Sequence, residues 1–328
     1  MLKVAMLSKW HVHAEDYANQ LLKSGKVEIV SVWDEIPTRG IEWAEKLGAK
    51  FHPSLDTVLS DPEIQAVICD TPTTMHKEVL IAAAKAGKNI FTEKMLATTL
   101  VEAKDIAKAV KEANVNFVIS YPLRRNALFQ WAKNLADSGE FGKIGMVRMR
   151  RSHSGISDNW LVDYWFDVSK TGGGAMMDLG AHPMYILSWF GGEPKRISAI
   201  FNKLYNTTSD ENALATIEFK NGIIGIGETS FVSYNTPDIL EIYGTDATLY
   251  IFGDQVKLTS KKKQGPDQGY FTPEIDRSEP KSAIECFIDA CLGTAPVPEE
   301  INIDSAVAVC ELMELAYKSN EQNIIVEV

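Results

Sequence analysis

The sequence is poor in cysteine, has no long hydrophobic run and carries fewer basic than acidic residues. Its four cysteines form no Cys-x-x-Cys pair, which argues against a disulfide framework or a structural zinc site. No apolar run approaches the roughly 20 residues of a membrane-spanning helix, and the N-terminus lacks the features of a signal peptide. We therefore expect a cytoplasmic protein without a membrane contact.

Basic charge is scarce throughout the chain. There are 33 Lys and Arg against 44 Asp and Glu, which gives a net charge of −11. A nucleic-acid interface needs clustered Lys and Arg to neutralise phosphates, and the single basic cluster, Lys261–Lys263, fits a solvated loop better. We expect no nucleic-acid partner and a small-molecule substrate.

The first 120 residues alternate between short β-rich runs and segments with helical periodicity. The expected strands are Val4–Leu7, Val27–Trp33, Ala66–Cys69, Asn89–Thr92 and Val115–Ser120. Between them, one helix should end at Gly87, and Thr99 with Glu102 predicts a capping box at the start of another. The alternation predicts an N-terminal domain of class α/β, over residues 1–121, with a doubly wound parallel sheet.

Residues 122–328 follow a different pattern, typical of an α+β domain on an open, mostly antiparallel sheet. The expected strands are Met146–Arg151, Ile197–Leu204, Ala213–Phe219, Ile223–Ser230 and Leu240–Tyr243. The expected helices are Asp178–Phe190, Ser282–Leu292 and Asp304–Tyr317. Asn221-Gly222 predicts a type I′ hairpin. One face of such a sheet must be covered or solvated, which favours a homodimer or homotetramer.

Ligands of a doubly wound sheet bind at the carboxyl ends of its strands. Asp34 ends the second expected strand, where an acid binds the adenosine ribose and repels a 2′-phosphate, so NAD is favoured, with NADP possible because Arg39 is near. Lys94 follows the fourth strand, where an ammonium can polarise a carbonyl or lower the pKa of a substrate hydroxyl. The alternatives are an acid at a helix N-terminus and an ordinary surface lysine.

A glycine-rich segment, Gly172–Gly174, precedes Asp178 and His182. Glycines permit close approach of backbone to a ligand, and a four-residue spacing places both polar side chains on one face of a helix. Histidine exchanges protons near neutral pH, and a carboxylate can orient it. The alternative is a helix-capping acid beside an unrelated histidine. Two ligands do not make a metal site, and His11 and His13 would complete one only if the fold brought them close, so we expect no metal.

Four aromatic residues lie within the segment Asn159–Phe166. Aromatic faces can pack on the C–H faces of a sugar ring, and anchoring of a loop or an oligomer contact explains the segment equally well.

In their order and spacing, these motifs resemble those of the Gfo/Idh/MocA family of sugar and polyol oxidoreductases, over nearly the whole chain. The matching segments are Thr71-Pro72-x-x-x-His76, Ala86-Gly87-Lys88, Glu93-Lys94 and Gly172 to His182. The resemblance implies a Rossmann domain that binds the dinucleotide and a C-terminal domain that binds a sugar-like substrate and forms the oligomer.

The resemblance also implies a catalytic group of Lys94, Asp178 and His182. His182 would remove the hydroxyl proton, Lys94 would favour the alkoxide, and Asp178 would orient His182 or the sugar. The expected cofactor-binding residues are Ser8, Trp10, His11, Asp34, Thr71, Thr73, His76 and Glu93. The expected substrate-binding residues are His13, Arg124, Trp160 and Tyr164.

The chain departs from the family pattern at two places. The family's Gly-x-Gly-x-x-Gly is replaced by Ser8–His13, as in a subgroup with a similar Ser-x-x-His-x-His loop, and no glycine precedes Gly25. Trp10 should obstruct the approach of backbone to the pyrophosphate unless the loop takes another path. Met95 replaces the family's proline after Lys94, and a cis peptide bond there would be costly.

The leading hypothesis is an NAD(P)-dependent dehydrogenase or reductase that acts on a hydroxyl or keto carbon of a sugar, polyol or cyclitol. An alternative is a lyase or hydrolase that oxidises its sugar transiently and retains the cofactor. A third is a non-catalytic protein that senses a dinucleotide. The altered loop favours this last class, and the retention of Lys94, Asp178 and His182 argues against it.

Overall fold

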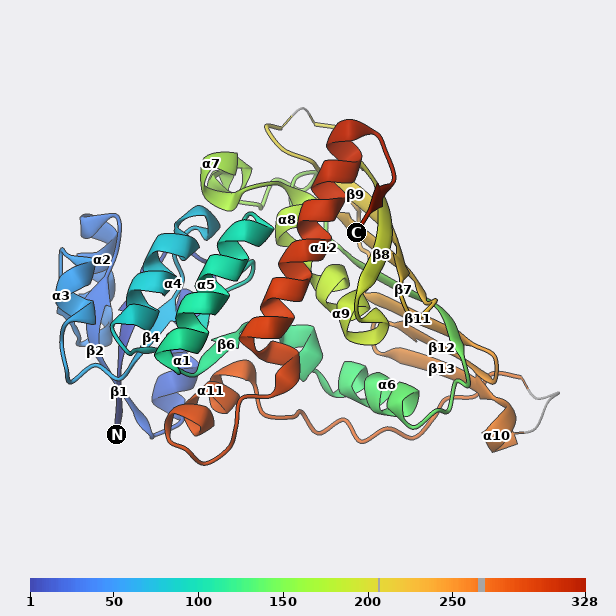
Figure 1. Ribbon diagram of the computed structural model, residues 1–328, viewed down its shortest axis with the longest axis horizontal. Helices are drawn as coiled ribbons and strands as arrows, with labels where there is room; N and C mark the ends of the chain where they lie inside the picture. The colour runs from blue at the N-terminus through green and yellow to red at the C-terminus, as the bar shows by residue number, and fades with distance from the viewer. Residues whose placement is uncertain (206, 265–268) are drawn as a thin grey trace. The chain divides into compact units, whose positions relative to one another are not determined.

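The computed structural model describes residues 1–205, 207–264 and 269–328, which form two compact units (Figure 1). The first unit comprises Met1–Pro122 and Lys281–Cys310, and the second comprises Leu123–Pro280 and Glu311–Val328. The expected domain boundary at residue 121 lies beside the observed one. The segment Lys281–Cys310, however, packs with the first unit and not with the second.

A six-stranded parallel sheet forms the core of the first unit. Its strands are β1 (Leu2–Leu7), β2 (Val27–Trp33), β3 (Lys50–Phe51), β4 (Ala66–Cys69), β5 (Asn89–Thr92) and β6 (Phe117–Ile119). The strand order is β3-β2-β1-β4-β5-β6, which is that of a doubly wound dinucleotide-binding sheet. β4 is buried at every residue, as expected of a parallel strand with both faces covered. The predicted fold class is therefore confirmed for this unit.

Helices follow the strands in alternation. They are α1 (Ala14–Lys23), α2 (Pro37–Leu47), α3 (Leu55–Leu59), the 3₁₀ helix η1 (Thr73–Met75), α4 (His76–Lys85) and α5 (Leu100–Ala113). Within the unit α4 and α5 lie side by side (Figure 1). Thr99 caps α5 by accepting the Glu102 N–H, but the Glu102 carboxylate accepts the Thr98 hydroxyl and not the Thr99 amide. The predicted capping box is thus only half formed.

The segment Lys281–Cys310 packs on the first unit through α11 (Ala283–Cys291) and the 3₁₀ helix η4 (Glu299–Ile301). α11 contacts α1, β5 and β6. Asp289 of α11 accepts hydrogen bonds from the ammonium groups of Lys281 and Lys26. No local pattern in the sequence marks this return of the chain, because the partners of α11 lie more than 160 residues earlier.

An eight-stranded sheet forms the core of the second unit. Its strands are β7 (Ile144–Ser152), β8 (Pro194–Asn202), β9 (Asn212–Phe219), β10 (Ile224–Ser230), β11 (Ile239–Gly244), β12 (Ala247–Phe252), β13 (Gln255–Ser260) and β14 (Val326–Glu327). The order is β13-β12-β11-β7-β10-β9-β8-β14, and every described pairing is antiparallel except that of β10 with β7. The prediction of an open, mostly antiparallel sheet is confirmed, although β12, β13 and β14 were not foreseen.

The turn between β9 and β10 is a hairpin, but not of the predicted type. A type I′ turn needs positive φ at both central residues. Gly222 has a φ of +89°, whereas Asn221 is not among the residues with positive φ. Gly222 N–H donates to Phe219 O at 2.9 Å, and Ile223 O accepts the Phe219 N–H at 2.9 Å. A type I turn followed by a left-handed glycine therefore closes the hairpin.

The helices that complete the second unit are α6 (Ala127–Asp137), α7 (Val168–Thr171), α8 (Ala175–Asp178), α9 (Ala181–Gly191), α10 (Lys261–Gln264) and the 3₁₀ helices η2 (Pro122–Arg125) and η3 (Asp163–Phe166). α12 (Ile303–Gln322) begins in the first unit and ends in the second. Among the described helices, none is both long enough and apolar enough to cross a lipid bilayer.

The two faces of the second sheet differ in burial. Along β8 and β9, Ile197, Ala199 and Ile217 are buried on one face, against which α9 packs at β7 and β10. On the other face, Ile200 is 69% exposed and its cross-strand partner Leu214 is 37% exposed. This alternation leaves one face of the sheet uncovered within the described chain.

The ion pairs of Asp289 lead to a prediction about acid stability. Hydrogen bonds from Lys281 and Lys26 outweigh burial and lower the pKa of Asp289 from 3.8 to about 2. A pKa that is lower in the folded state stabilises the fold above pH ~4, and this contribution is lost as the pH falls toward 2. We expect Asp289→Asn to lower the free energy of unfolding at pH 7 by about 2 kcal/mol, with a smaller difference at pH 3.

Urea denaturation of both proteins at the two pH values measures this effect. Asp304→Asn is the matched control, because Asp304 also pairs with a lysine but its side chain is 66% exposed. Its cost should stay below about 0.5 kcal/mol. A cost of Asp289→Asn that is the same at pH 7 and pH 3 would contradict the assignment.

Candidate active site

The loops that follow β1, β4 and β5 meet at the carboxyl edge of the first sheet. His11 N–H donates to Asp70 O at 3.1 Å, and Glu93 N–H donates to Cys69 O at 3.2 Å. The chain reverses its strand order between β1 and β4, which is where such sheets bind ligands. The three segments expected to bind the cofactor therefore lie together within the first unit.

Ser8 makes the turn that glycine makes in the family's usual loop. Its φ is +74°, in the left-handed region that favours glycine. The buried Ser8 Oγ accepts the Trp10 N–H at 3.0 Å and the Arg39 Nη2–H at 3.2 Å. These hydrogen bonds offset the roughly 1 kcal/mol that positive φ costs a residue with a Cβ.

Trp10 and the histidines occupy the remainder of this loop. Trp10 is 6% exposed, and its ring centroid lies 6.0 Å from that of His11. His13 stands at the N-cap of α1, where no side chain caps the helix in the described structure. The N-terminus of a ten-residue helix is a place where phosphate binds. The loop thus keeps the helix N-terminus of a dinucleotide site without the glycines.

Asp34 lies at the end of β2, as predicted, and its carboxylate is fully engaged. Oδ1 accepts the Ile36 N–H and Arg39 Nη2–H, both at 2.7 Å. Oδ2 accepts the Lys9 N–H at 2.8 Å and the Arg39 Nε–H at 2.9 Å. Four donors fill the four acceptor positions of a carboxylate. Asp34 therefore anchors the loop after β1 in addition to any role toward a ribose.

Glu93 is the centre of a buried polar cluster. Its side chain is 2% exposed, and Oε1 accepts the Tyr17 hydroxyl and lies 2.9 Å from His13 Nδ1. Oε2 accepts the Lys94 N–H at 2.8 Å. Burial alone would raise the pKa of Glu93, but His11, His13 and Lys94 outweigh burial and lower it. Glu93 is therefore a carboxylate at neutral pH.

Asp70 is also buried, but its pKa is shifted in the direction opposite to that of Glu93. It is fully buried, and neither carboxyl oxygen has a hydrogen-bond partner among the described residues. Burial, together with the nearby charge of Glu93, raises the pKa of Asp70 well above its usual range. Burial thus favours the uncharged form of Asp70, whereas the neighbouring cationic groups favour the carboxylate form of Glu93.

Lys94 is 7% exposed and directly follows the Glu93 cluster. The peptide bond between Lys94 and Met95 is cis, so the backbone takes the isomer that the sequence marks as costly. Buried hydrogen bonds fix the backbone on both sides of the bond. Lys94 N–H donates to Glu93, and Met95 O lies 2.8 Å from His76 Nδ1.

The polar side chains of the segment after β4 mainly contact other groups of the protein. His76 is buried, with Nδ1 beside Met95 O and Nε2 3.1 Å from Thr71 O, so its ring bridges the segments after β4 and β5. Burial lowers the pKa of His76. Thr71 Oγ1 lies 3.2 Å from Cys69 Sγ, and Thr73 begins η1. These contacts position the segment, while cofactor contact by its side chains stays a prediction.

The glycines of the Gly172–Gly174 motif have a structural reason within the second unit. A Cβ on Gly174 would lie 2.2 Å from Asp210 O, and one on Gly173 would lie 2.1 Å from the Tyr317 hydroxyl oxygen. Asp210 accepts the N–H groups of Gly174 at 3.0 Å and Met176 at 2.7 Å, so it caps the start of α8. Close packing against Asp210 and Tyr317 therefore explains these glycines without a ligand.

The predicted helix Asp178–Phe190 is interrupted. α8 ends at Asp178 and α9 begins at Ala181. Gly180 N–H donates to Ala175 O and His182 N–H to Leu179 O, so the regular bonding to the fourth preceding residue is broken. Asp178 and His182 belong to two helices, and the four-residue spacing on one helical face does not apply.

His182 is buried, and its ring is fixed from within the second unit. Nδ1 lies 2.7 Å from the hydroxyl oxygen of Tyr185, one turn along α9. The Tyr185 oxygen also accepts the Leu123 N–H at 3.1 Å. Burial raises the pKa of Tyr185, so the phenol stays protonated at neutral pH. Asp178 is partly exposed at the end of α8.

The predicted substrate contacts of the second unit differ in exposure. Arg124 is 2% exposed, and its Nε–H donates to Tyr185 O at 3.0 Å. Trp160 is 55% exposed and packs on His153, with ring centroids 4.6 Å apart. Tyr164 lies beside Trp165 in η3. Of these residues, Trp160 is the one that presents a wide aromatic face.

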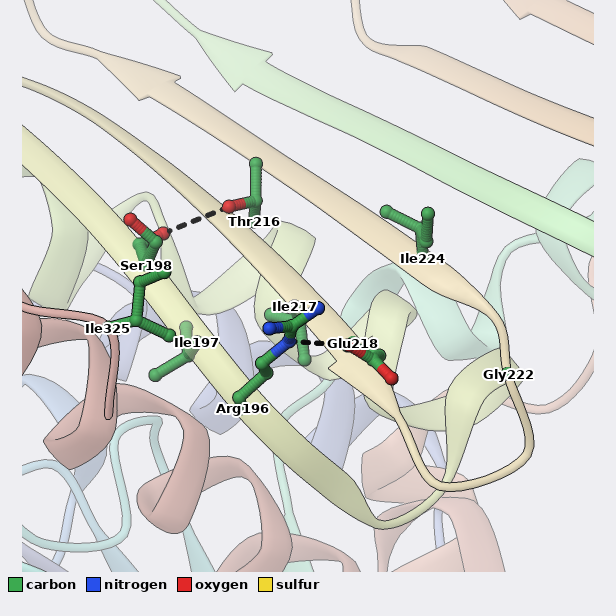
Figure 2. A pocket seen from close by; sticks show the side chains of 9 residues that line it. All are labelled: Arg196, Ile197, Ser198, Thr216, Ile217, Glu218, Gly222, Ile224 and Ile325. Atoms are coloured by element: carbon green, nitrogen blue, oxygen red, sulfur yellow. Dashed lines mark hydrogen bonds and ion pairs between the residues drawn. The ribbon is translucent and has the colours of Figure 1, made fainter. Parts of the chain in front are cut away.

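A shallow cavity of about 400 Å³ lies on the uncovered face of the second sheet. Figure 2 shows its lining: the Arg196–Glu218 ion pair and the Thr216–Ser198 hydrogen bond lie on β8 and β9, with Ile224 on β10. The charged side chains that line the cavity are already paired with one another. The cavity contains none of the predicted site residues.

Sequence reasoning missed four residues that support the site: Tyr17, Asp70, Tyr185 and Asp210. Tyr185 had a local signal, because it lies three residues after His182 and thus one helical turn away. Asp70 directly precedes the recognised Thr71-Pro72 motif. Tyr17 and Asp210 had none, since their partners Glu93 and Gly174 lie 76 and 36 residues away.

Two family models match this chain. The model described as "Oxidoreductase family, NAD-binding Rossmann fold" matches residues 10–121, and that described as "GFO/IDH/MocA C-terminal domain" matches residues 129–250. The chain belongs to the Gfo/Idh/MocA family. These matches confirm the predicted family and the predicted fold, which has two parts and includes a Rossmann domain. They also confirm NAD as the cofactor and the class of oxidoreductases.

Curated relatives are named sugar and inositol enzymes. scyllo-Inositol 2-dehydrogenase (NAD(+)) of Bacillus subtilis strain 168 is 32% identical over 232 residues, which cover 68% of this chain and 66% of that enzyme. Levoglucosan dehydrogenase of Pseudarthrobacter phenanthrenivorans is 26% identical over 267 residues, covering 72% of this chain and 68% of that enzyme. The match to the inositol enzyme spans slightly less than two thirds of its length.

Solved structures match along the whole chain. GenD2 from gentamicin A biosynthesis, in complex with NAD, is 26% identical with a TM-score of 0.82, covering 100% of this chain and 96% of that one. A levoglucosan dehydrogenase complex with NADH and levoglucosan has a TM-score of 0.87 at 21% identity, with 100% and 99% covered, and shows a shared fold.

The Ser8 turn leads to a prediction about how this member of the family holds its loop. Ser8→Ala removes both hydrogen bonds and keeps the Cβ at positive φ, so we expect it to cost about 1–3 kcal/mol of unfolding free energy. Ser8→Gly loses the same bonds but relieves the backbone, and should cost about 1 kcal/mol less. Chemical denaturation of both variants measures the order, and a glycine variant no more stable than the alanine variant would refute this role of Ser8.

Proposed function

We propose that this chain transfers hydride between NAD and a hydroxyl or keto carbon of a sugar, polyol or cyclitol. The observation that carries the proposal is the placement of Lys94. It is a nearly buried ammonium that follows β5 at the same sheet edge as Asp34 and the uncapped N-terminus of α1. The relatives named as dehydrogenases of scyllo-inositol and levoglucosan support this substrate class.

The described residues fit a dinucleotide. Asp34 would bind the adenosine ribose, and the loop Ser8–His11 with the start of α1 would hold the pyrophosphate. Thr71, Thr73, His76 and Glu93 would complete the site from the segments after β4 and β5. When bound, the nicotinamide accepts or supplies the hydride. Asp34 must exchange one of its four donors for a ribose hydroxyl, and Arg39 is the donor on a movable side chain.

The protein's own groups would handle the proton and the developing charge. Lys94 would stabilise the alkoxide that forms when the substrate hydroxyl loses its proton. His182 would take that proton at Nε2, in the tautomer whose Nδ1–H donates to the Tyr185 oxygen. Asp178 would orient the sugar or His182, and His13, Arg124, Trp160 and Tyr164 would contact the substrate. In the reverse direction His182 would return the proton.

Two alternative functions differ from this proposal in the residues that they need or the products that they release. A lyase or hydrolase that oxidises its sugar transiently would use the same Lys94 and His182, but it would release no net NADH. A non-catalytic sensor would need neither side chain. The buried hydrogen bonds that fix the Lys94 amide and the His182 ring favour a catalytic role, because a sensor has no use for positioned proton-transfer groups.

We also propose that a second copy of the chain covers the open sheet face. The side chains Ile200, Leu214, Ile224 and Phe252 are between 37% and 69% exposed there, on the face opposite the buried core of the sheet. Exposed apolar side chains on a sheet face, here beside the ion pairs of Arg196 and Arg148, are typical of an interface between copies. Sedimentation at neutral pH should show a mass of two or four chains, and a monomer would refute the proposal.

Fluorescence titration with NADH and NADPH tests the cofactor. We expect NADH to bind about tenfold or more tightly than NADPH, because the Asp34 carboxylate accepts a ribose hydroxyl and repels a 2′-phosphate. Asp34→Ala should weaken NADH binding and narrow the preference. Glu28→Ala, an exposed acid on the same strand, is the control and should change neither constant. Absence of binding by both dinucleotides would defeat the proposal.

Lys94→Ala tests the chemistry. We expect kcat with an accepted sugar or polyol to fall by at least about 100-fold, with NADH affinity nearly unchanged. Lys85→Ala, at an exposed lysine of α4, is the control. Unchanged kcat in the Lys94 variant would overturn the role of Lys94. The mass of the product, measured beside NADH formation, separates a dehydrogenase from a cofactor-retaining lyase.

A further inference from the structure

The fold brings together three metal-ligating side chains that the sequence separates. His11 and His13 lie in the loop after β1, and Glu93 follows β5. The potential ligand atoms of these residues all lie within 4.8 Å of one another. His13 Nδ1 is 2.9 Å and His11 Nδ1 is 3.9 Å from the same oxygen, Glu93 Oε1. We propose that His11, His13 and Glu93 bind a divalent transition-metal ion of the zinc class.

The spacing suits such an ion. Ligand atoms about 2.1 Å from a tetrahedral zinc ion lie about 3.4 Å from one another. The two observed nitrogen–oxygen distances, 2.9 and 3.9 Å, lie on either side of this value. Side-chain adjustments would have to bring all three ligand atoms, which lie within 4.8 Å of one another, to this spacing. The ion would take the place of the proton that His13 shares with Glu93.

Surrounding hydrogen bonds orient the ligands. His11 Nδ1 accepts the His13 N–H at 3.2 Å, so this nitrogen carries no proton, as a metal ligand requires, and the ion would displace this contact. Tyr17 and the Lys94 N–H donate to the two oxygens of Glu93, which keeps this side chain charged and fixed. Hydrogen bonds from surrounding residues to the ligand side chains are typical of metal sites.

The three side chains differ in exposure, which leaves the site open on one side. The side chains of His11 and Glu93 are 3% and 2% exposed, whereas that of His13 is 49% exposed. An ion can therefore enter past His13 and keep a water molecule there. Two imidazoles and one carboxylate with one open position form the ligand set of many zinc sites. Imidazole ligands favour zinc and its neighbours over magnesium or calcium.

The expectation of no metal rested on Asp178 and His182, which supply only two ligands. The cluster lies elsewhere, and its carboxylate is 80 residues from His13 in the sequence. The inference goes beyond the proposed hydride transfer, because the binding of the ion does not depend on the redox chemistry.

The test uses the full chain without a histidine tag, stripped with a chelator and titrated with zinc chloride by calorimetry. We expect one zinc ion per chain at micromolar affinity or better. His13→Ala should weaken zinc binding at least about tenfold; its half-exposed side chain can be removed without opening a core cavity. Glu93→Gln should do the same. His52→Ala, in the same unit but outside the cluster, should bind zinc as the unaltered protein does.

Absence of stoichiometric zinc binding at micromolar concentration would overturn the inference, as would unchanged affinity in a folded His13→Ala protein. Circular dichroism shows whether each variant is folded. NADH titration of the same stripped protein separates the two proposals. NADH binding without zinc binding rejects the metal site alone, and zinc binding without NADH binding rejects the dehydrogenase alone.

Discussion

A buried carboxylate, Glu93, holds the carboxyl edge of the first unit together. It accepts hydrogen bonds from Tyr17 of α1 and from the Lys94 amide, and it pairs with His13 of the loop after β1. A buried charge without such partners would cost several kcal/mol. The loop after β1, the helix α1 and the backbone of Lys94 are therefore fixed in a single arrangement, because any other leaves Glu93 unpaired. The loop after β1 depends on a charged side chain at a place where the family pattern has glycines.

Much of the fold was predictable because its signals are local. The alternation of strands and helices gave the doubly wound sheet, and three strands, β2, β4 and β5, have the predicted bounds. Contacts between distant segments were not predictable. The packing of α11 on the first unit depends on Asn116 and Lys26, far from it in sequence. β14 is a two-residue strand whose partner β8 lies about 130 residues earlier, and nothing in its own sequence marks it.

The candidate site also divides into features with a local signal in the sequence and features that depend on distant segments. Asp34, Lys94 and His182 were found because each follows a local pattern: a strand end, a charged residue after a strand, a histidine near glycines. The supporting residues Tyr17 and Asp210 were not found, because they act across long sequence distances. The glycine motif was assigned to a ligand, yet Gly174 packs against the backbone of Asp210. A glycine pattern predicts a close approach, but the sequence does not say whether the approaching group is a ligand or the protein itself.

The charge states at this edge explain how an acidic chain accommodates an anionic cofactor. Asp34, Asp70 and Glu93 all lie at the ends of neighbouring strands, and three free carboxylates there would repel a pyrophosphate. Arg39 pairs with Asp34, and His13 and Lys94 surround Glu93. Asp70 has no such partner among the described residues, and burial beside Glu93 raises its pKa, which favours its uncharged form. Each of the three acids is thus paired or has its uncharged form favoured, and under the proposed function the positive N-terminus of α1 would attract a phosphate.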